Sequence, residues 1–191
     1  MSVSPLPLCE WMNFTDDTYI VLDVPPSEWT EHILSVRRQL DAWRAALPVE
    51  VTITGSAGVG TFHEEQKQEA AFRVIDILAS EVAPIKTKFL SIKRFPNSGV
   101  FYFEPADTQP FINLQNRIIA TGLKFKPSSF SYIPHCTIAN LKKNPSDEAV
   151  HKIYGIESSE EVMLEVLSFY AINQSGCQLL HRTKLYGTQA L

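Results

Sequence analysis

The sequence has no long hydrophobic run and no positive charge near its start. These two absences argue against a membrane-spanning helix and against a signal peptide. No stretch of its 191 residues approaches 18 consecutive apolar side chains, the length that a membrane-spanning helix needs. The first Lys or Arg is Arg37, whereas a signal peptide begins with a positively charged segment. We therefore expect a protein without a membrane anchor that resides in the cytoplasm.

Cysteine is scarce as well. Cys9, Cys136 and Cys177 form no Cys-x-x-Cys pair, and an odd number leaves at least one thiol unpaired. We expect reduced thiols and no disulfide framework. The sequence also lacks a His-x₃-His pattern or a Cys cluster with metal-ligand spacing. The prediction is a site without metal and without a cofactor.

Charge is modest overall but unevenly distributed. The chain has 17 basic and 21 acidic residues, a net charge of -4, and 45% hydrophobic residues, as in an ordinary globular protein. Residues 84–143, however, contain nine Lys or Arg and two Asp or Glu. Two interpretations are open for this segment: a solvated surface, or a rim that attracts the end of a nucleic acid. Six of the nine side chains are the candidates for such a rim: Lys86, Lys88, Lys93, Arg94, Lys124 and Lys126.

The hydrophobic pattern predicts regular structure from residue 18 onward, after an N-terminal extension of residues 1–17 that has no period. Prolines and glycines separate the predicted elements. In the first half we expect a strand at 19–22, a helix at 29–47, a strand at 49–53, a helix at 61–82 that begins with the capping box of Thr61 and Glu64, and a strand pair at 85–95 and 100–103.

The second half repeats the order helix, strand, helix, strand pair. We expect a helix at 111–122, a strand at 132–139, a helix that starts at Asn144, and strands at 162–172 and 179–186. The repetition indicates an internal duplication. It predicts a single two-lobed α+β domain over residues 18–191.

A histidine and a threonine share one face of the expected strand at 132–139. Side chains alternate along a strand, so His135 and Thr137 point to one side while Cys136 and Ile138 point to the other. Such a pair suits a phosphate, because the hydroxyl can donate to a phosphate oxygen and the imidazole can transfer a proton. The alternative is that His135 is an ordinary histidine whose hydrogen bonds are satisfied within a sheet.

The first half carries a matching pair 85 positions earlier. Glu50 and Thr52 occupy the positions on the strand at 49–53 that correspond to His135 and Thr137. The two halves therefore present Glu-x-Thr and His-x-Thr. We expect the four side chains to face one cleft within about 10 Å, the scale of one bound phosphate and its contacts. Glu50 as a solvated strand residue is the alternative.

At these residues the sequence resembles the 2H phosphoesterase superfamily, which includes 2'-5' RNA ligase-like and cyclic phosphodiesterase proteins. Members carry two His-x-Thr/Ser motifs on pseudo-symmetric lobes around a common cleft. The second motif is intact as His135-Cys136-Thr137-Ile138, whereas the first reads Glu50-Val51-Thr52-Ile53 and lacks its histidine. The resemblance implies a bilobal, pseudo-symmetric α+β fold with two antiparallel sheets around a central cleft and helices outside.

The resemblance also implies roles for these residues. In the family one histidine is the general base, the other is the general acid, and the two hydroxyls hold the phosphate. His135 would then be catalytic, and Thr52 and Thr137 would bind phosphate. Glu50 would replace the missing catalytic histidine, and it would need to be protonated or separated from the ligand by water, because a carboxylate repels an anion.

The function implied is a phosphodiesterase for 2',3'-cyclic or 2'-5'-linked nucleotide or RNA-end phosphodiesters, slowed by the missing histidine. The alternative is a non-catalytic protein that binds a nucleotide or an RNA end. Three aromatic residues, Tyr132, Phe101 and Phe103, are candidates for stacking on a base, although strand core is their ordinary role.

Overall fold

The computed structural model describes residues 12–141, 144–173 and 176–188, which form eight strands and five helices. The strands are β1 (Asp17–Asp23), β2 (Glu50–Thr54), β3 (Ile85–Arg94), β4 (Val100–Pro105), β5 (Cys136–Asn140), β6 (Glu161–Leu164), β7 (Val166–Asn173) and β8 (Gly176–Lys184). The helices are α1 (Glu28–Leu40), α2 (Ala42–Ala45), α3 (Gln68–Glu81), α4 (Gln109–Ala120) and α5 (Asp147–Tyr154).

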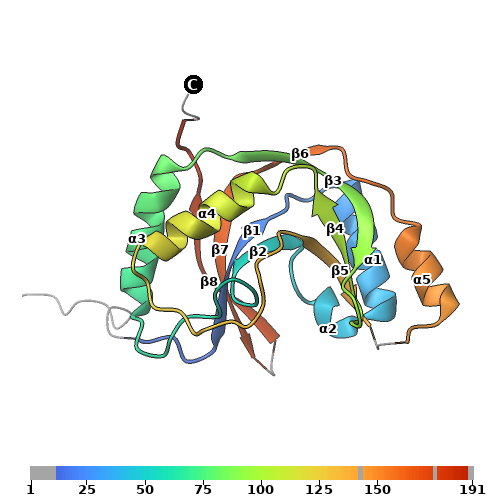
Figure 1. Cartoon of the computed structure of the whole chain (residues 1–191), viewed down its shortest axis with the longest axis horizontal. Helices are drawn as coiled ribbons and strands as arrows, with labels where there is room; N and C mark the ends of the chain where they lie inside the picture. Colours follow the sequence, from blue (N-terminus) through green and yellow to red (C-terminus); the bar gives the residue numbers. More distant parts are fainter. Residues whose placement is uncertain (1–11, 142–143, 174–175, 189–191) are drawn as a thin grey trace, which may run out of the picture.

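The eight strands form one antiparallel sheet in the order β6-β3-β4-β5-β2-β1-β7-β8. The sheet curls, with α3 and α4 at one end of the molecule and α1, α2 and α5 at the other (Figure 1). The α+β class is therefore confirmed. Two separate sheets were expected, and the structure instead joins two groups of four strands into one sheet.

The join between the two groups is the contact between β2 and β5. Within the groups, β1 pairs with β2 and β4 pairs with β5 over four residue pairs each. Between β2 and β5 the register contains one pair, Val51 with Cys136. The groups β2-β1-β7-β8 and β5-β4-β3-β6 are arranged symmetrically about this pair, so each motif strand is the innermost strand of its group.

The long helix expected at 29–47 is two helices. Ser27 caps α1 through a reciprocal pair of hydrogen bonds with Thr30, which satisfies amides that a helix start leaves open. The helix stops at Leu40, because the side chain of Asp41 accepts a hydrogen bond from the amide of Arg44 and caps α2 instead. A local side-chain bond therefore overrides the helical period.

The capping box expected at Thr61 is wrong, since α3 begins seven residues later. The Thr61 hydroxyl donates to the Asp17 carboxylate at 2.9 Å. Phe62, next to it, is 1% exposed and stacks on Phe14 at a centroid distance of 4.3 Å. Burial of this aromatic pair holds Thr61 and Phe62 in the core, while residues 63–67 continue as a loop toward α3. The same stacking joins the end of the expected N-terminal extension to the folded body.

The second half departs from expectation at three places. Strand β5 starts at Cys136, so residues 132–135 precede the strand, and Pro134 has no amide hydrogen to give to a ladder. Ser146, not Asn144, caps α5. The run expected at 162–172 splits into β6, which pairs with β3, and β7, which pairs with β1 and β8. The chain therefore crosses from one strand group to the other at this point.

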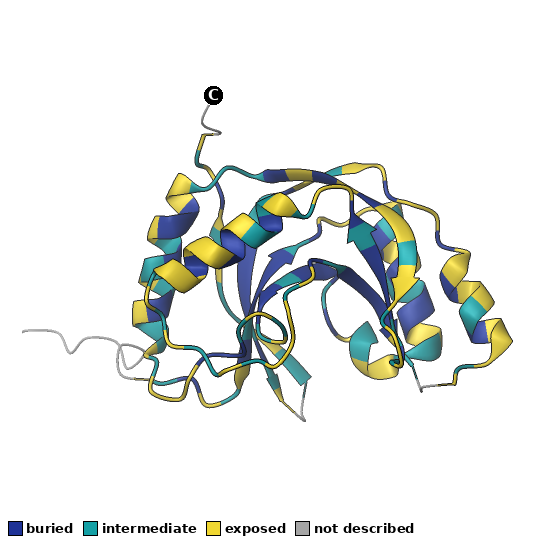
Figure 2. Cartoon of the chain, viewed as in Figure 1, coloured by how far each residue is buried: buried dark blue, intermediate teal, exposed yellow. Residues whose placement is uncertain are grey.

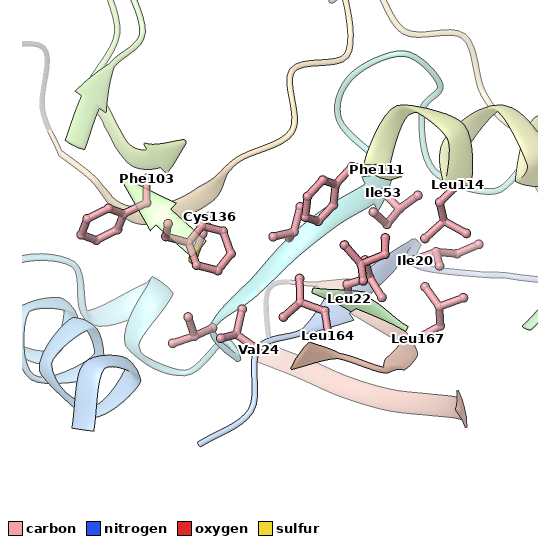
Figure 3. Close-up of a cluster of buried hydrophobic side chains, with 14 of the residues drawn as sticks. Ile20, Leu22, Val24, Ile53, Phe103, Phe111, Leu114, Cys136, Leu164 and Leu167 are labelled. Atoms are coloured by element: carbon pink, nitrogen blue, oxygen red, sulfur yellow. The ribbon is translucent and has the colours of Figure 1, made fainter. Parts of the chain in front are cut away.

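Helices cover one face of the sheet, and their buried residues lie on the sides that face the strands (Figure 2). Phe111 and Leu114 of α4 pack over Ile20, Leu22 and Ile53 of β1 and β2 (Figure 3). Each such side chain contributes roughly 1.5–3 kcal/mol by leaving water. Because side chains alternate along a strand, the neighbours of these core residues point to the other face, where the candidate site lies.

Candidate functional site

The face of the sheet away from α1, α3 and α4 contains a pocket of about 620 Å³, and α2 lies at its edge. Glu50 and Thr52 line it from β2, and His135 and Thr137 line it from the second motif. The residues between them, Val51 and Cys136, are fully buried in the core. The four side chains expected to share one cleft therefore share one pocket.

The contact between β2 and β5, where the two strand groups meet, sets the arrangement of these four side chains. We call this contact the seam. Val51 and Cys136 are partners in an antiparallel ladder. In such a ladder the flanking residues run in opposite directions, so Glu50 lies beside Thr137 and Thr52 lies beside the start of the second motif. Each half of the site is thus placed against the other by backbone pairing.

Glu50 is 9% exposed, and its Oε2 accepts a 2.9 Å hydrogen bond from the hydroxyl of Thr52. Burial raises the pKa of the Glu50 carboxyl above its usual range. Arg44, the Thr52 hydrogen bond and Arg37 act in the opposite direction, and Asp23, its partner in the β1–β2 register, adds to the rise. The environment therefore favours the protonated, uncharged form relative to a glutamate in water.

His135 lies directly before β5 with its ring between aromatic side chains. Its Nδ1 is 2.6 Å from the carbonyl oxygen of Ile133, and a carbonyl only accepts, so Nδ1 carries the hydrogen. The rings of Phe95 and Tyr102 pack edge-on at 5.0 and 5.2 Å. Burial lowers the pKa of the imidazole. Burial therefore favours the neutral imidazole, in which Nε2 has a lone pair.

The backbone of each threonine is braced by a side chain from elsewhere. The Thr52 carbonyl accepts a hydrogen bond of 3.0 Å from the hydroxyl of Tyr132. The Thr137 carbonyl accepts one of 2.7 Å from Arg37. Tyr132, expected as a stacking residue, thus ties the segment before the second motif to the strand of the first, and it does not line the pocket.

The other two expected stacking residues lie in the core. Phe101 is 1% exposed and packs edge-on against Tyr154, and Phe103 is fully buried against Trp29. Both residues therefore have the ordinary role of strand residues in the core. The aromatic residues that line the pocket are instead Tyr19, Trp43, Phe95, Phe130 and Tyr170.

Arg44 is a pocket residue that the sequence patterns did not single out. It is the one Lys or Arg among the described residues that line the pocket. Its Nε is buried without a hydrogen-bond partner, and Oδ2 of Asp41 lies 3.9 Å from it. Its position depends on the Asp41 cap of α2, which the helical period of the sequence concealed. A guanidinium that lines a pocket is suited to binding an anionic ligand.

The basic segment does not form a rim of the pocket. Of the six side chains named above, four pair with carboxylates on the surface, and none of the six lines the pocket. The pairs are Lys86 with Glu161, Lys93 with Glu104, Lys124 with Glu65, and Lys126 with Asp17. The solvated-surface interpretation fits these contacts.

The residues that the structure describes contain neither a metal-binding cluster nor a membrane-spanning helix. Among them, no group of three or more His, Cys, Asp or Glu side chains is placed to hold a metal ion. In the same part of the chain, no helix has the length and apolar character needed to cross a bilayer.

The comparison with known families agrees with the fold and the motif positions. Residues 24–174, which include both motifs, match the model of the 2'-5' RNA ligase superfamily. The chain belongs to this superfamily, and the resemblance to 2H phosphoesterases is confirmed. No curated protein sequence matches the chain significantly.

Solved structures share the fold at low sequence identity. The structure of TT0787 from Thermus thermophilus is 16% identical, covers 91% of this chain and 100% of its own, and has a TM-score of 0.61. Escherichia coli LigT in complex with 3'-AMP is 17% identical, with coverages of 89% and 98% and a TM-score of 0.59. A structure described as a phosphoesterase is also 17% identical, with the same coverages and a TM-score of 0.55.

Proposed function

We propose that the protein is a phosphodiesterase that acts on 2',3'-cyclic or 2'-5'-linked nucleotide or RNA-end phosphodiesters. The observation that carries the proposal is the position of an imidazole and a buried carboxyl in one pocket. His135 has a free Nε2, and Glu50 has a raised pKa. Groups whose surroundings favour a neutral base and a protonated acid are suited to base and acid catalysis respectively.

In the proposed reaction, Nε2 of His135 takes a proton from a water molecule as that water attacks phosphorus. The bond between phosphorus and one ribose oxygen breaks, and the Glu50 carboxyl gives its proton to that oxygen. Thr137 and Thr52 hold the non-bridging oxygens. Solvent then returns a proton to Glu50 and takes one from His135. The side chains supply every proton transfer, so we expect turnover in the presence of a chelator.

Arg44 gives the phosphate its countercharge. Two unit charges about 4 Å apart interact by about 4 kcal/mol at an effective dielectric of 20. An ionised Glu50 would oppose ligand binding by a similar amount. Protonation of Glu50 removes this repulsion and leaves the attraction of Arg44. The raised pKa of Glu50 therefore supports both the binding and the chemical step.

The ligands of a relative support a nucleotide as the substrate. Structures of E. coli LigT are described as complexes with 3'-AMP, ATP and NADP⁺. For this chain we propose a nucleotide phosphodiester, with its base among the aromatic residues of the pocket. A cytoplasmic location is part of the proposal, in keeping with the free thiols of Cys136 and Cys177.

One observation favours a second candidate, a nucleotide or RNA-end binding protein without catalysis. The Thr52 hydroxyl, expected to hold phosphate, donates to Glu50 in this structure. If that hydrogen bond persists with ligand bound, the pocket retains its cation and aromatic residues but lacks one phosphate contact and one proton donor.

Turnover and binding measured separately distinguish the two. We would incubate the protein with 2',3'-cyclic nucleotides and 2'-5'-linked dinucleotides in EDTA, and measure affinity by calorimetry. His135→Ala is expected to lower turnover by about 10²-fold or more. His151→Ala, at an exposed position of α5, is the matched control. Binding without turnover in the wild type would support the second candidate, and neither binding nor turnover would contradict both.

A further inference from the structure

Arg37 is a buried cation that the proposed chemistry does not use. It lies on α1 with 0% of its surface exposed and is among the largest fully buried side chains. Its neighbour Arg38 is exposed and pairs with Glu31. A charge is rarely buried to this extent unless its hydrogen-bonding groups are satisfied, so the partners of Arg37 indicate what it does.

The guanidinium of Arg37 donates to backbone carbonyls on both sides of the seam between the strand groups. Nη2 donates to Thr137 at 2.7 Å, and Nε donates to Ile138 at 3.1 Å. Nη1 donates to Leu47 at 3.1 Å and to Pro48 at 2.9 Å. The first two carbonyls belong to the strand of the second motif, and the last two lie in the segment that leads through Val49 into the strand of the first.

The seam needs such a connection because its own ladder is short. The register of β2 and β5 contains the single pair of Val51 and Cys136, whereas each strand has four pairs within its own group. The ladders thus fix each motif within its group more firmly than they fix one motif to the other. A planar guanidinium can span the two backbones, which the single ammonium of a lysine cannot do with the same geometry.

We propose that Arg37 is a positioning residue that sets the spacing between the two halves of the site, Glu50 with Thr52 and His135 with Thr137. The functional consequence of this inference rests on the proposed function, but the spacing itself does not. Arg37 also lies close enough to lower the pKa of Glu50, against the effect of burial. Arg37 therefore has a geometric effect and an electrostatic effect, and two substitutions separate them.

Arg37→Lys keeps the charge and loses the planar fork, and Arg37→Met loses both. Arg38→Met is the control at the exposed neighbouring position. We expect Arg37→Lys to lower kcat on the order of 10- to 100-fold with a smaller change in KM, because misplaced reacting groups cost rate more than binding. The pKa of Glu50, followed by carbon-13 NMR of its carboxyl, should change little in Arg37→Lys and rise in a folded Arg37→Met.

Amide hydrogen exchange supplies a readout that does not depend on turnover. In Arg37→Lys, exchange should speed up at β2 and β5 while β7 and β8 remain as in the wild type. Wild-type levels of both kcat and seam exchange in folded Arg37→Lys would overturn the proposal. If the wild type proves inactive, the proposed function fails while faster exchange confined to the seam still supports the positioning role. Should Arg37→Met fail to fold, Arg37→Lys carries the test.

Discussion

The backbone of Val51 pairs with that of Cys136, and this pair is where the two four-stranded groups of the sheet meet. Both side chains are fully buried on the helix-covered face. Their flanking residues consequently project from the opposite face, into the pocket. A single backbone pairing thus brings together two motifs that are 85 residues apart in sequence.

Arg44 is expected to supply the main attraction for an anionic ligand. Arg44→Gln should weaken binding of a nucleotide monophosphate by roughly 10-fold or more, since a charge-assisted hydrogen bond contributes about 1.5–3 kcal/mol. Arg117→Gln, which removes a surface cation paired with Glu81 outside this pocket, is the control. Equal affinities of the two variants, measured by calorimetry, would remove Arg44 from the binding site.

Trp43 and Phe130 are expected to contact the base. They line the pocket and are 53% and 73% exposed, which is high for large aromatic side chains. Trp43→Ala should reduce nucleotide affinity by about 1–3 kcal/mol, the usual contribution of one stacked base, and leave inorganic phosphate affinity unchanged. Tyr186→Ala, 61% exposed and outside this pocket, should change neither. A parallel loss of phosphate affinity would argue against stacking.

The proposed roles require a bell-shaped dependence of kcat/KM on pH. His135 must be neutral to accept a proton, and because burial lowers its pKa, the acid limb should lie below the usual histidine range. Glu50 must be protonated, and because burial raises its pKa, the basic limb should lie above the usual glutamate range. A profile that keeps rising through neutral pH would contradict the acid role of Glu50.

The raised pKa of Glu50 should also affect how the free energy of unfolding depends on pH. A carboxyl whose pKa is higher in the folded state binds more protons when folded, so the free energy of unfolding falls as pH rises from the ordinary value of 4.5 through the raised one. Glu50→Gln removes this dependence. The difference in unfolding free energy between wild type and Glu50→Gln, followed by urea denaturation across pH, isolates it from the contribution of His135. A difference that does not change with pH would contradict the raised pKa.

The face on which each motif residue lies could be predicted because it depends on a local rule. Alternation along a strand places His135 and Thr137 on one face, and the same rule places Glu50 and Thr52 on the matching face. The order of helices and strands was visible in the same way. These features depend on neighbours in sequence, so the sequence was sufficient to predict them.

Features that depend on residues far apart in the sequence were harder to predict. The capping box at Thr61 was locally plausible, but Thr61 bonds to Asp17 and Phe62 stacks on Phe14 in the core, so the helix begins later. Arg37 fell on the apolar stripe of a helix, and its partners at Thr137 and Ile138 are about 100 positions away. Its role depends on which carbonyls the folded chain leaves open, which no period in the sequence reports.

The rate of the Glu50→Gln variant tests the central claim most directly. Glutamine keeps the shape of the side chain and can still accept the hydrogen bond from Thr52, but it has no proton to transfer. We expect Glu50→Gln to lower kcat for a 2',3'-cyclic nucleotide by about 10²- to 10⁴-fold with little loss of affinity. Glu50→His, which restores a group with a pKa near 6.5, should exceed the wild-type rate at neutral pH. A Glu50→Gln enzyme as fast as the wild type would contradict the claim that Glu50 transfers a proton.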